Sequence, residues 1–273
     1  MAMRETVGVS VVIPCYRCAD TIERAVDSVY AQTRLPAEVI LVDDYSGDGT
    51  LALLHRIKKA HPEGWIKVIE ANVNGGAGTA RNLGWAAATQ PFIAFLDADD
   101  SWHPQKIEIQ HGWMQAHPEA ALTGHACQQT TDKNAATDMK ADYSDRPATF
   151  HQITKRQILL SNRFSTPAVM LRRELAFRFA NGKRYSEDFL LWAEICCSGQ
   201  PCYRTELPLA YLFKAPYGEG GLSAQLWNME KGQLGTYVAL FRRGHFGRFG
   251  LSLLAGLSMA KFVRRVLIQM KVS

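Results

Sequence analysis

Two aspartates follow a run of apolar residues and have the spacing to share a metal ion. Residues 92–96 are five consecutive apolar side chains, a pattern typical of a buried strand in a parallel sheet. Asp97 and Asp99 come directly afterwards, so their carboxylates point the same way if the chain stays extended. Carboxylate oxygens are hard ligands that suit Mg2+ or Mn2+, and such an ion can hold a diphosphate. The alternative is that both aspartates only end the strand and cap the helix expected near Pro104.

A second carboxylate pair, Glu187 and Asp188, follows Ser186, and this order predicts a helix that begins here with the serine as its cap. Two acidic residues in a first helical turn complement the helix dipole, and this alone accounts for the pair. The helix N-terminus would also keep a carboxylate ionised, with a pKa near the reference value of about 3.9, and so able to accept a proton.

The elements that position these carboxylates can be read from the periodicity of the first hundred residues. Apolar runs predict strands, and apolar residues at helical spacing predict helices between them, the first with a capping-box-like start at Asp20 and Glu23. The expected strands are 9–13, 38–42, 65–69 and 92–96, and the expected helices run from about 20 to 30, 50 to 59 and 79 to 88. Strands that alternate with helices at this spacing indicate an α/β fold with a parallel sheet, whose ligands bind at the carboxyl ends of the strands.

The second half has a weaker pattern. Helices are expected at 104–115, at 149–160 and from 186, and strands at 120–127 and 167–171. Residues 128–147 are polar and unpatterned, which predicts a surface loop. Residues 215–223 contain three glycines, which predicts a mobile loop in which Lys214 meets a diphosphate on closure; an ordinary surface turn is an equally good interpretation.

Several other chemistries are disfavoured by the motifs. The first strand ends in Pro-Cys-Tyr-Arg-Cys instead of the glycine-rich dinucleotide motif, and no P-loop sequence occurs. Cys15 and Cys18 have redox spacing, but the next helix begins too late to lower the pKa of either thiol. Cys196, Cys197 and Cys202 lack the spacing of a second zinc pair. Six cysteines at these spacings are expected to be reduced thiols.

Four segments together resemble a known family. They are Val-Ser-Val-Val-Ile-Pro-Cys-Tyr (9–16), Val-Asp-Asp-Tyr-Ser-Gly-Asp-Gly-Thr (42–50), Asn-Gly-Gly-Ala-Gly-Thr-Ala-Arg-Asn (74–82) and Phe-Leu-Asp-Ala-Asp-Asp (95–100). Their order and spacing are similar to those of family 2 glycosyltransferases, which are inverting enzymes. The resemblance implies a GT-A fold, with a Rossmann-like, largely parallel central sheet and helices on both faces.

The resemblance also implies which residues bind the nucleotide. Pro14 and Tyr16 would line the base and ribose pocket, Asp43 would bind the nucleobase, and Arg81 would face the nucleotide. A tyrosine ring suits this place because it offers a flat apolar surface to a pyrimidine. The alternatives are that Tyr16 only packs, that Asp43 only caps the following helix and that Arg81 lies on a helix surface.

The same resemblance gives the carboxylates their roles. Asp97 would hold ribose or metal, and Asp99 the metal. Because the family carries a Glu-Asp pair before a tryptophan, Asp188 would be the catalytic base and Glu187 its neighbour. Mg2+ or Mn2+ is the expected cofactor.

These roles predict an inverting, metal-dependent transfer of a sugar from a nucleotide-diphosphate donor, with UDP the expected nucleotide, to a hydroxyl of a lipid-linked or polysaccharide acceptor. Residues 1–100 would bind the donor and residues 101–227 the acceptor. The alternatives are a non-catalytic nucleotide-sugar-binding or membrane-scaffold protein, and a sugar-nucleotide pyrophosphorylase. The last is disfavoured because the first strand is not followed by a glycine- and arginine-rich loop.

The end of the chain carries the excess positive charge. No acidic residue follows Glu230, whereas the first 230 residues hold all 26 acidic but only 23 of the 31 basic side chains. Residues 249–260 are too few to span a bilayer, so we expect residues 228–273 to form a basic amphipathic helical tail on an anionic membrane, with a helix packed on the body as the alternative. No nucleic-acid-binding motif accompanies the charge. With no signal peptide evident, the expected location is the cytoplasmic face of the cell membrane.

Overall fold

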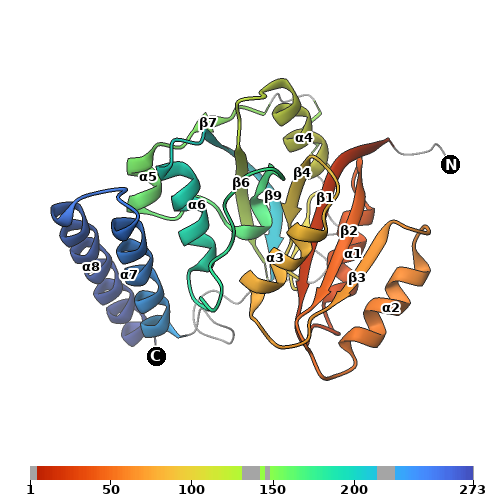
Figure 1. Cartoon of the computed structure of the whole chain (residues 1–273), viewed down its shortest axis with the longest axis horizontal. Helices are drawn as coiled ribbons and strands as arrows, with labels where there is room; N and C mark the ends of the chain where they lie inside the picture. The colour runs from red at the N-terminus through yellow and green to blue at the C-terminus, as the bar shows by residue number, and fades with distance from the viewer. Residues whose placement is uncertain (1–4, 131–141, 145–147, 214–224, 273) are drawn as a thin grey trace.

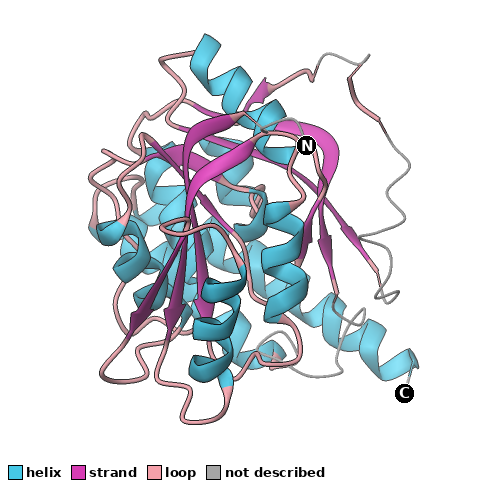
Figure 2. Cartoon of the chain, turned by 90° about the vertical axis from the view of Figure 1, so that its right-hand side faces the viewer, coloured by secondary structure: helices cyan, strands magenta, loops and turns pink. Residues whose placement is uncertain are grey.

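The computed structural model of the chain describes residues 5–130, 142–144, 148–213 and 225–272. A central sheet lies between two layers of helices, and two further helices extend the molecule on one side (Figures 1 and 2). Each face of the sheet carries its own hydrophobic core.

The first hundred residues form parallel strands joined by helices. The strands are β1 (Thr6–Cys15), β2 (Leu35–Asp43), β3 (Ile66–Glu70) and β4 (Phe92–Phe95), and the helices are α1 (Ile22–Tyr30), α2 (Thr50–Ala60) and α3 (Ala77–Ala87). β1 pairs in parallel with β2 and with β4, and β2 pairs in parallel with β3. The predicted parallel sheet is therefore confirmed.

The two faces of β1 explain how the helices are distributed. Val9 and Val11 pack in the same core as α1 and α2, whereas Val12 packs on the opposite face, against α3. Gly84 allows α3 to come close to the sheet, because a Cβ atom there would lie 2.4 Å from Cγ1 of Val12. The sheet is therefore covered by helices on both faces. Because β1 to β4 are parallel, their carboxyl ends lie along the same edge of the sheet.

The rest of the chain extends the same sheet. Its strands are β5 (Ser101–Trp102), β6 (Leu122–Gln129), β7 (His151–Gln152), β8 (Met170–Arg172) and β9 (Cys202–Leu212). Its helices are α4 (Lys106–Ala116), α5 (Lys155–Leu160), the 3-10 turn η1 (Thr166–Ala168) and α6 (Glu187–Cys197). The strand order is β3-β2-β1-β4-β8-β6-β9-β5, with β7 paired to β9. β8 is antiparallel to both neighbours, which makes the sheet mixed at its centre.

Several boundaries differ from the sequence prediction. The helix expected over 149–160 is wrong in its first part, because residues 151–152 pair with β9 and the helix begins only after Thr154, which forms a capping box with Gln157. The expected strand 167–171 begins at Met170. The capping box expected at Asp20 is wrong, since α1 begins after Thr21 without a side-chain cap. β5 and β9 were not predicted.

The tail consists of α7 (Leu226–Arg242) and α8 (Arg248–Val272). α7 packs against α6, and α8 packs against α7 at the left of Figure 1. Glu230 is fully buried between the two tail helices, where it accepts hydrogen bonds from the Ser258 hydroxyl at 2.6 Å and the Arg265 guanidinium at 2.8 Å. The tail is therefore attached to the body through α7, and also through Lys261 of α8, which donates a hydrogen bond to the Leu160 carbonyl of α5.

α8 also has an apolar side that faces away from α7. Its exposed large apolar residues are Phe249, Leu253, Leu257, Val263, Leu267 and Ile268, and Phe249 is 83% exposed. Among the helices formed by described residues, none is both long and apolar enough to cross a bilayer.

Candidate functional site

Three aspartates converge at the carboxyl end of β4. The strand ends at Phe95, and the chain then turns, with the Asp100 N–H donating to the Asp97 carbonyl at 3.1 Å. Carboxylate oxygens of Asp97, Asp99 and Asp100 all lie within 4.8 Å of one another. The sequence predicted that extended geometry would align Asp97 and Asp99, and this is wrong, because a turn brings them together and adds Asp100.

The three carboxylates fit a hard divalent cation. Such ions take several oxygen ligands at short range, and a cluster of acidic oxygens of this size supplies them. Asp100 is buried and its Oδ1 accepts a hydrogen bond from the Phe213 N–H at 3.3 Å, while Arg24 donates to the Asp99 carbonyl and lies 3.8 Å from the Phe213 ring centroid. The cluster is thus held from the side of β9 as well as from β4.

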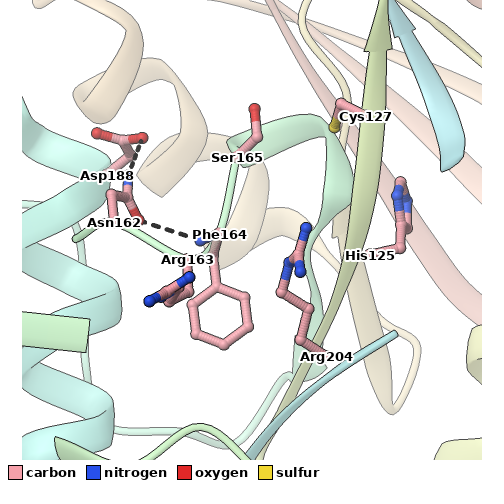
Figure 3. Close-up of a pocket in the computed structure, with 8 residues that line it drawn as sticks. All are labelled: His125, Cys127, Asn162, Arg163, Phe164, Ser165, Asp188 and Arg204. Carbon is pink, nitrogen blue, oxygen red and sulfur yellow. Dashed lines mark hydrogen bonds between the residues drawn. The ribbon is translucent and has the colours of Figure 1, made fainter. Parts of the chain in front are cut away.

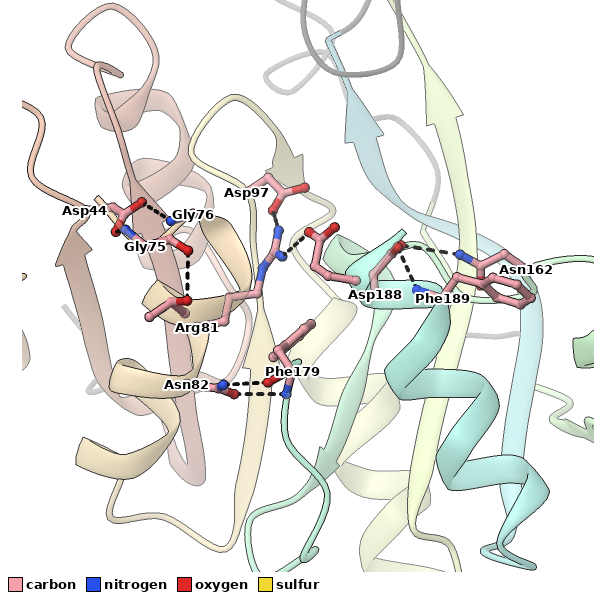
Figure 4. A network of polar contacts seen from close by, with 12 residues as sticks. Asp44, Gly75, Gly76, Arg81, Asn82, Asp97, Asn162, Phe179, Asp188 and Phe189 are labelled. Atoms are coloured by element: carbon pink, nitrogen blue, oxygen red, sulfur yellow. Dashed lines mark hydrogen bonds and ion pairs between the residues drawn. The ribbon is translucent and has the colours of Figure 1, made fainter. Parts of the chain in front are cut away.

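Arg81, from α3, connects the cluster to the second carboxylate pair. Its guanidinium donates to Asp97 Oδ1 at 2.6 Å and to Glu187 Oε1 at 3.1 Å, and its side chain is only 5% exposed (Figure 4). Burial alone would lower the pKa of Arg81, but the charges of Asp97 and Glu187 outweigh it and raise the pKa above its ordinary value. The arginine is therefore a fixed cation between two carboxylates.

Asp188 lies beside Glu187 in the first turn of α6. Its Oδ1 accepts a hydrogen bond from the Phe189 N–H at 2.7 Å, and its Oδ2 accepts one from Asn162 at 3.3 Å. Burial and the charge of Glu187 raise the pKa of Asp188 to about 6. The expectation of a pKa near the reference value is wrong, because these effects outweigh the helix N-terminus. Ser186 precedes the helix with a positive φ of 54° and makes no side-chain cap, contrary to the prediction.

The residues expected to bind the nucleotide surround the ends of β1 and β2. Pro14 lies opposite Val42 in the sheet, and Tyr16 follows β1 with 46% of its surface exposed, so it is not a core residue. Asp43 is buried and accepts a hydrogen bond from the Ser46 hydroxyl at 2.6 Å. Whether these three bind a nucleotide stays a prediction.

The neighbouring Asp44 holds the glycine loop. Its two carboxylate oxygens accept hydrogen bonds from the Gly75 and Gly76 N–H groups at 2.9 and 2.8 Å (Figure 4). Gly76 has a φ of 80° immediately before α3, a conformation that favours glycine. This contact sets where α3 begins and hence where Arg81 lies.

The remaining candidates from the sequence are Lys214 and the cysteines. Lys214 and the glycine-rich segment after it lie outside the described residues. All six cysteines are free thiols. Burial and the neighbouring Cys18 raise the pKa of Cys15 well above its ordinary value, which is the opposite of an activated redox thiol.

A pocket of about 300 Å3 opens beside Asp188. It is lined by His125, Cys127, Asn162, Arg163, Phe164, Ser165, Asp188 and Arg204 (Figure 3). Burial raises the pKa of Cys127 to about 12, and the charges of Asp100 and Asp97 contribute to this shift. The pocket therefore lies within electrostatic reach of the aspartate cluster as well as next to Asp188. None of its residues other than Asp188 was a sequence candidate.

Comparison with known proteins identifies the family. A family model described as glycosyl transferase family 2 matches residues 10–178, which is more than half of the chain. The chain belongs to glycosyltransferase family 2. The resemblance noted in the four sequence segments is thereby confirmed.

Relatives of this family 2 chain include bacterial proteins. The succinoglycan biosynthesis protein ExoO of Rhizobium meliloti is 40% identical over 106 residues, which are 39% of this chain and 29% of ExoO. The Escherichia coli enzyme WfgD, a UDP-Glc:alpha-D-GlcNAc-diphosphoundecaprenol beta-1,3-glucosyltransferase, is 28% identical over 187 residues, which are 68% of this chain and 69% of WfgD. The chain spans less than half the length of the first curated relatives it matches.

Solved glycosyltransferase structures confirm the GT-A fold. Staphylococcus aureus TarS in complex with UDP-GlcNAc superposes with a TM-score of 0.68 at 18% identity, over 95% of this chain and 72% of TarS. The mannosyltransferase PcManGT of Pyrobaculum calidifontis, solved with GDP-Man and Mn2+, gives a TM-score of 0.67 at 17% identity, over 97% of this chain and 76% of PcManGT.

Proposed function

We propose that this protein is an inverting glycosyltransferase that uses a nucleotide-diphosphate sugar, with UDP as the nucleotide, and transfers the sugar to a hydroxyl of a lipid-linked or polysaccharide acceptor. The single observation that carries the proposal is the continuous chain of contacts from Asp97 through Arg81 to Glu187, next to Asp188 (Figure 4). These contacts join the candidate metal ligands to the candidate base, an arrangement that a transfer reaction requires and a passive binding protein does not.

On the donor side, Asp97, Asp99 and Asp100 would hold Mg2+ or Mn2+. When bound, this ion would supply positive charge that stabilises the departing diphosphate. Pro14, Tyr16 and Asp43 would bind the nucleoside. Because the Arg81 guanidinium already pairs with Asp97 and Glu187, it would orient Asp97 and would not itself donate a hydrogen bond to the nucleotide. We assign residues 1–100 to this donor half.

On the acceptor side, Asp188 would act as the general base. A carboxylate with a pKa of about 6 is mostly ionised at neutral pH and is a stronger base than one at its ordinary value. It would take the proton of the acceptor hydroxyl while the hydroxyl oxygen bonds to the anomeric carbon and the bond to the diphosphate breaks. Glu187 would keep the pKa of Asp188 raised and hold Arg81. Residues 101–227 would form this acceptor half.

The test is nucleotide release from a panel of nucleotide sugars with Mn2+, together with donor affinity. Asp188→Asn is expected to abolish transfer and to leave donor affinity within about twofold of the wild type. Asp27→Asn removes an exposed carboxylate of α1 and serves as the control. Unchanged turnover in Asp188→Asn would remove it from the role of base, and absence of release with every donor would refute the enzymatic function.

The same proposal places the protein on the cytoplasmic face of a cell membrane, with residues 228–273 as its contact. The exposed apolar side of α8 supports this, since a stripe from Phe249 to Ile268 lies on a helix that has Arg248, Lys261 and Arg264 and no acidic residue. α7 attaches the tail to α6, so the body would be held near a lipid-linked acceptor.

Vesicle binding tests the membrane contact. Leu253→Glu combined with Leu257→Glu changes two exposed residues without touching the packed side of α8, so folding is expected to be retained. The wild type is expected to sediment with phosphatidylglycerol-containing vesicles and the double variant to stay in solution. Equal partitioning of the two proteins would refute the contact.

A further inference from the structure

The pocket beside Asp188 contains nitrogen atoms that have no hydrogen-bond partner among the described residues. They are His125 Nε2 and Arg204 Nε. His125 is 2% exposed. Folded proteins leave few buried polar groups unpaired, because each costs free energy comparable to a lost hydrogen bond. Two such groups that line one pocket indicate a place where a ligand completes the bonding.

The tautomer of His125 defines what kind of partner it needs. Its Nδ1 lies 2.7 Å from the Ala126 carbonyl, which can only accept, so Nδ1 carries the proton. Burial and the positive charge of Lys106 lower the pKa of His125 to about 3, and Arg204 and His103 act in the same direction. His125 is therefore neutral, and its unpaired Nε2 is an acceptor that fits a hydroxyl group.

Arg204 defines the charge of the ligand. Its side chain is 19% exposed, and its one ion-pair partner among the described residues is Glu206, whose side chain is 75% exposed. A pair with such an exposed carboxylate is weak, so the guanidinium can exchange it for a ligand anion. Arg163 also lines the pocket. Among the described residues that line it, Asp188 is the only acidic side chain, and Figure 3 shows Asp188 and Arg204 on opposite sides.

We propose that this pocket is an acceptor subsite for an anionic sugar, in which Arg204 binds a phosphate or carboxylate group and His125 Nε2 accepts a hydrogen bond from a sugar hydroxyl. The polarity of the pocket orients the acceptor, because its anionic end is attracted to Arg204 and repelled by Asp188. The reacting hydroxyl is thereby directed to the base. That the bound anion is the sugar acceptor rests on the proposed function, whereas the binding of an anion in this pocket does not.

Calorimetric titration without donor tests the subsite. Inorganic pyrophosphate represents a phosphate-linked acceptor and glucuronate represents a uronic acid, and both are titrated at pH 7.5 with a chelator so that no metal holds them. The wild type is expected to bind at least one probe. Arg204→Gln is expected to weaken that binding about tenfold, whereas Arg173→Gln, which removes an exposed arginine beyond the end of β8, is expected to leave it unchanged.

A second variant moves affinity in the opposite direction. Glu206→Gln removes the carboxylate that competes with the ligand anion for Arg204, and it is expected to tighten anion binding severalfold. This variant keeps Arg204, so it tests the subsite even if Arg204→Gln folds poorly. Binding of pyrophosphate alone assigns a phosphate-bearing acceptor, and binding of glucuronate alone assigns a uronic acid.

Two results would overturn the subsite: no binding of either probe, or equal affinity in wild type, Arg204→Gln and Glu206→Gln. UDP affinity with Mn2+ should stay within twofold in Arg204→Gln, since the donor site is separate; a parallel loss would mean that the arginine serves the donor. Retained anion binding in a protein that transfers no sugar would refute the proposed function and leave the subsite intact.

Discussion

Asp188→Asn is expected to make the protein more stable while removing its activity. The folded-state pKa of about 6 lies about two units above the ordinary value of 3.8, so ionised Asp188 is held at a cost of up to about 3 kcal/mol, at about 1.4 kcal/mol per unit. Asp188 is partly exposed, and solvent screening reduces this to about 1–2 kcal/mol. An asparagine keeps the hydrogen bond from the Phe189 N–H but carries no charge.

The pH dependence gives the sign of this effect. Because the folded pKa is raised, the cost is fully present above about pH 6 and disappears as the pH falls towards the unfolded value near 4. In metal-free buffer at pH 7 the thermal midpoint of Asp188→Asn should exceed that of the wild type by about 2–6 °C. At pH 4 the two midpoints should coincide.

Thermal unfolding followed by circular dichroism measures both proteins across this range. Asp27→Asn, which removes an exposed carboxylate from α1, controls for the loss of one negative charge and should show no such pH-dependent gain. Two results would refute the reasoning that burial and Glu187 destabilise ionised Asp188. One is an Asp188→Asn protein that is less stable than the wild type at pH 7, and the other is a difference in thermal midpoint that is the same at pH 4 and pH 7.

Three further predictions follow from the contacts. Arg81→Met leaves Asp97 and Glu187 without their buried cation and should lower the unfolding free energy by about 3 kcal/mol in urea titrations; a loss below 1 kcal/mol would show that the bridge is dispensable. Asp99→Ala should weaken Mn2+-dependent UDP binding at least tenfold by calorimetry, and wild-type affinity would argue against the metal site. Gly84→Ala should cost about 1–3 kcal/mol because its Cβ would overlap Val12, and an unchanged thermal midpoint would contradict the close packing of α3.

The first hundred residues were predictable because their patterns are local. Each strand there is a mostly apolar run, and each helix has its own apolar spacing, so neither depends on distant contacts. β7 was missed because two exposed residues, 151–152, are held as a strand only by pairing with β9. The turn after β4 was not predicted, because nothing in the sequence of the aspartates shows that the strand ends at Phe95.

The sequence indicated most residues of the candidate site, but not the contacts between them or the shifted pKa of Asp188. The resemblance selected Asp97, Asp99, Glu187 and Asp188, which the fold brings to one rim. The bridging position of Arg81 depends on a contact between α3 and α6, which lie more than 100 residues apart in the sequence. The raised pKa of Asp188 depends above all on its burial in the folded chain, which the local sequence does not show. No pattern pointed to His125 or Arg204, since single polar residues in strands carry no signal until their neighbours are known.

The pH dependence of kcat/KM for nucleotide release tests the central claim most directly, because a base with a raised pKa must lose activity when it is protonated. The account predicts a plateau above about pH 7 and a fall of about tenfold per pH unit below about pH 6, with the fall moved to lower pH in Glu187→Gln, which removes a charge that raises the pKa of Asp188. A rate that stays constant down to pH 4.5 in the wild type would contradict the assignment of Asp188 as the base.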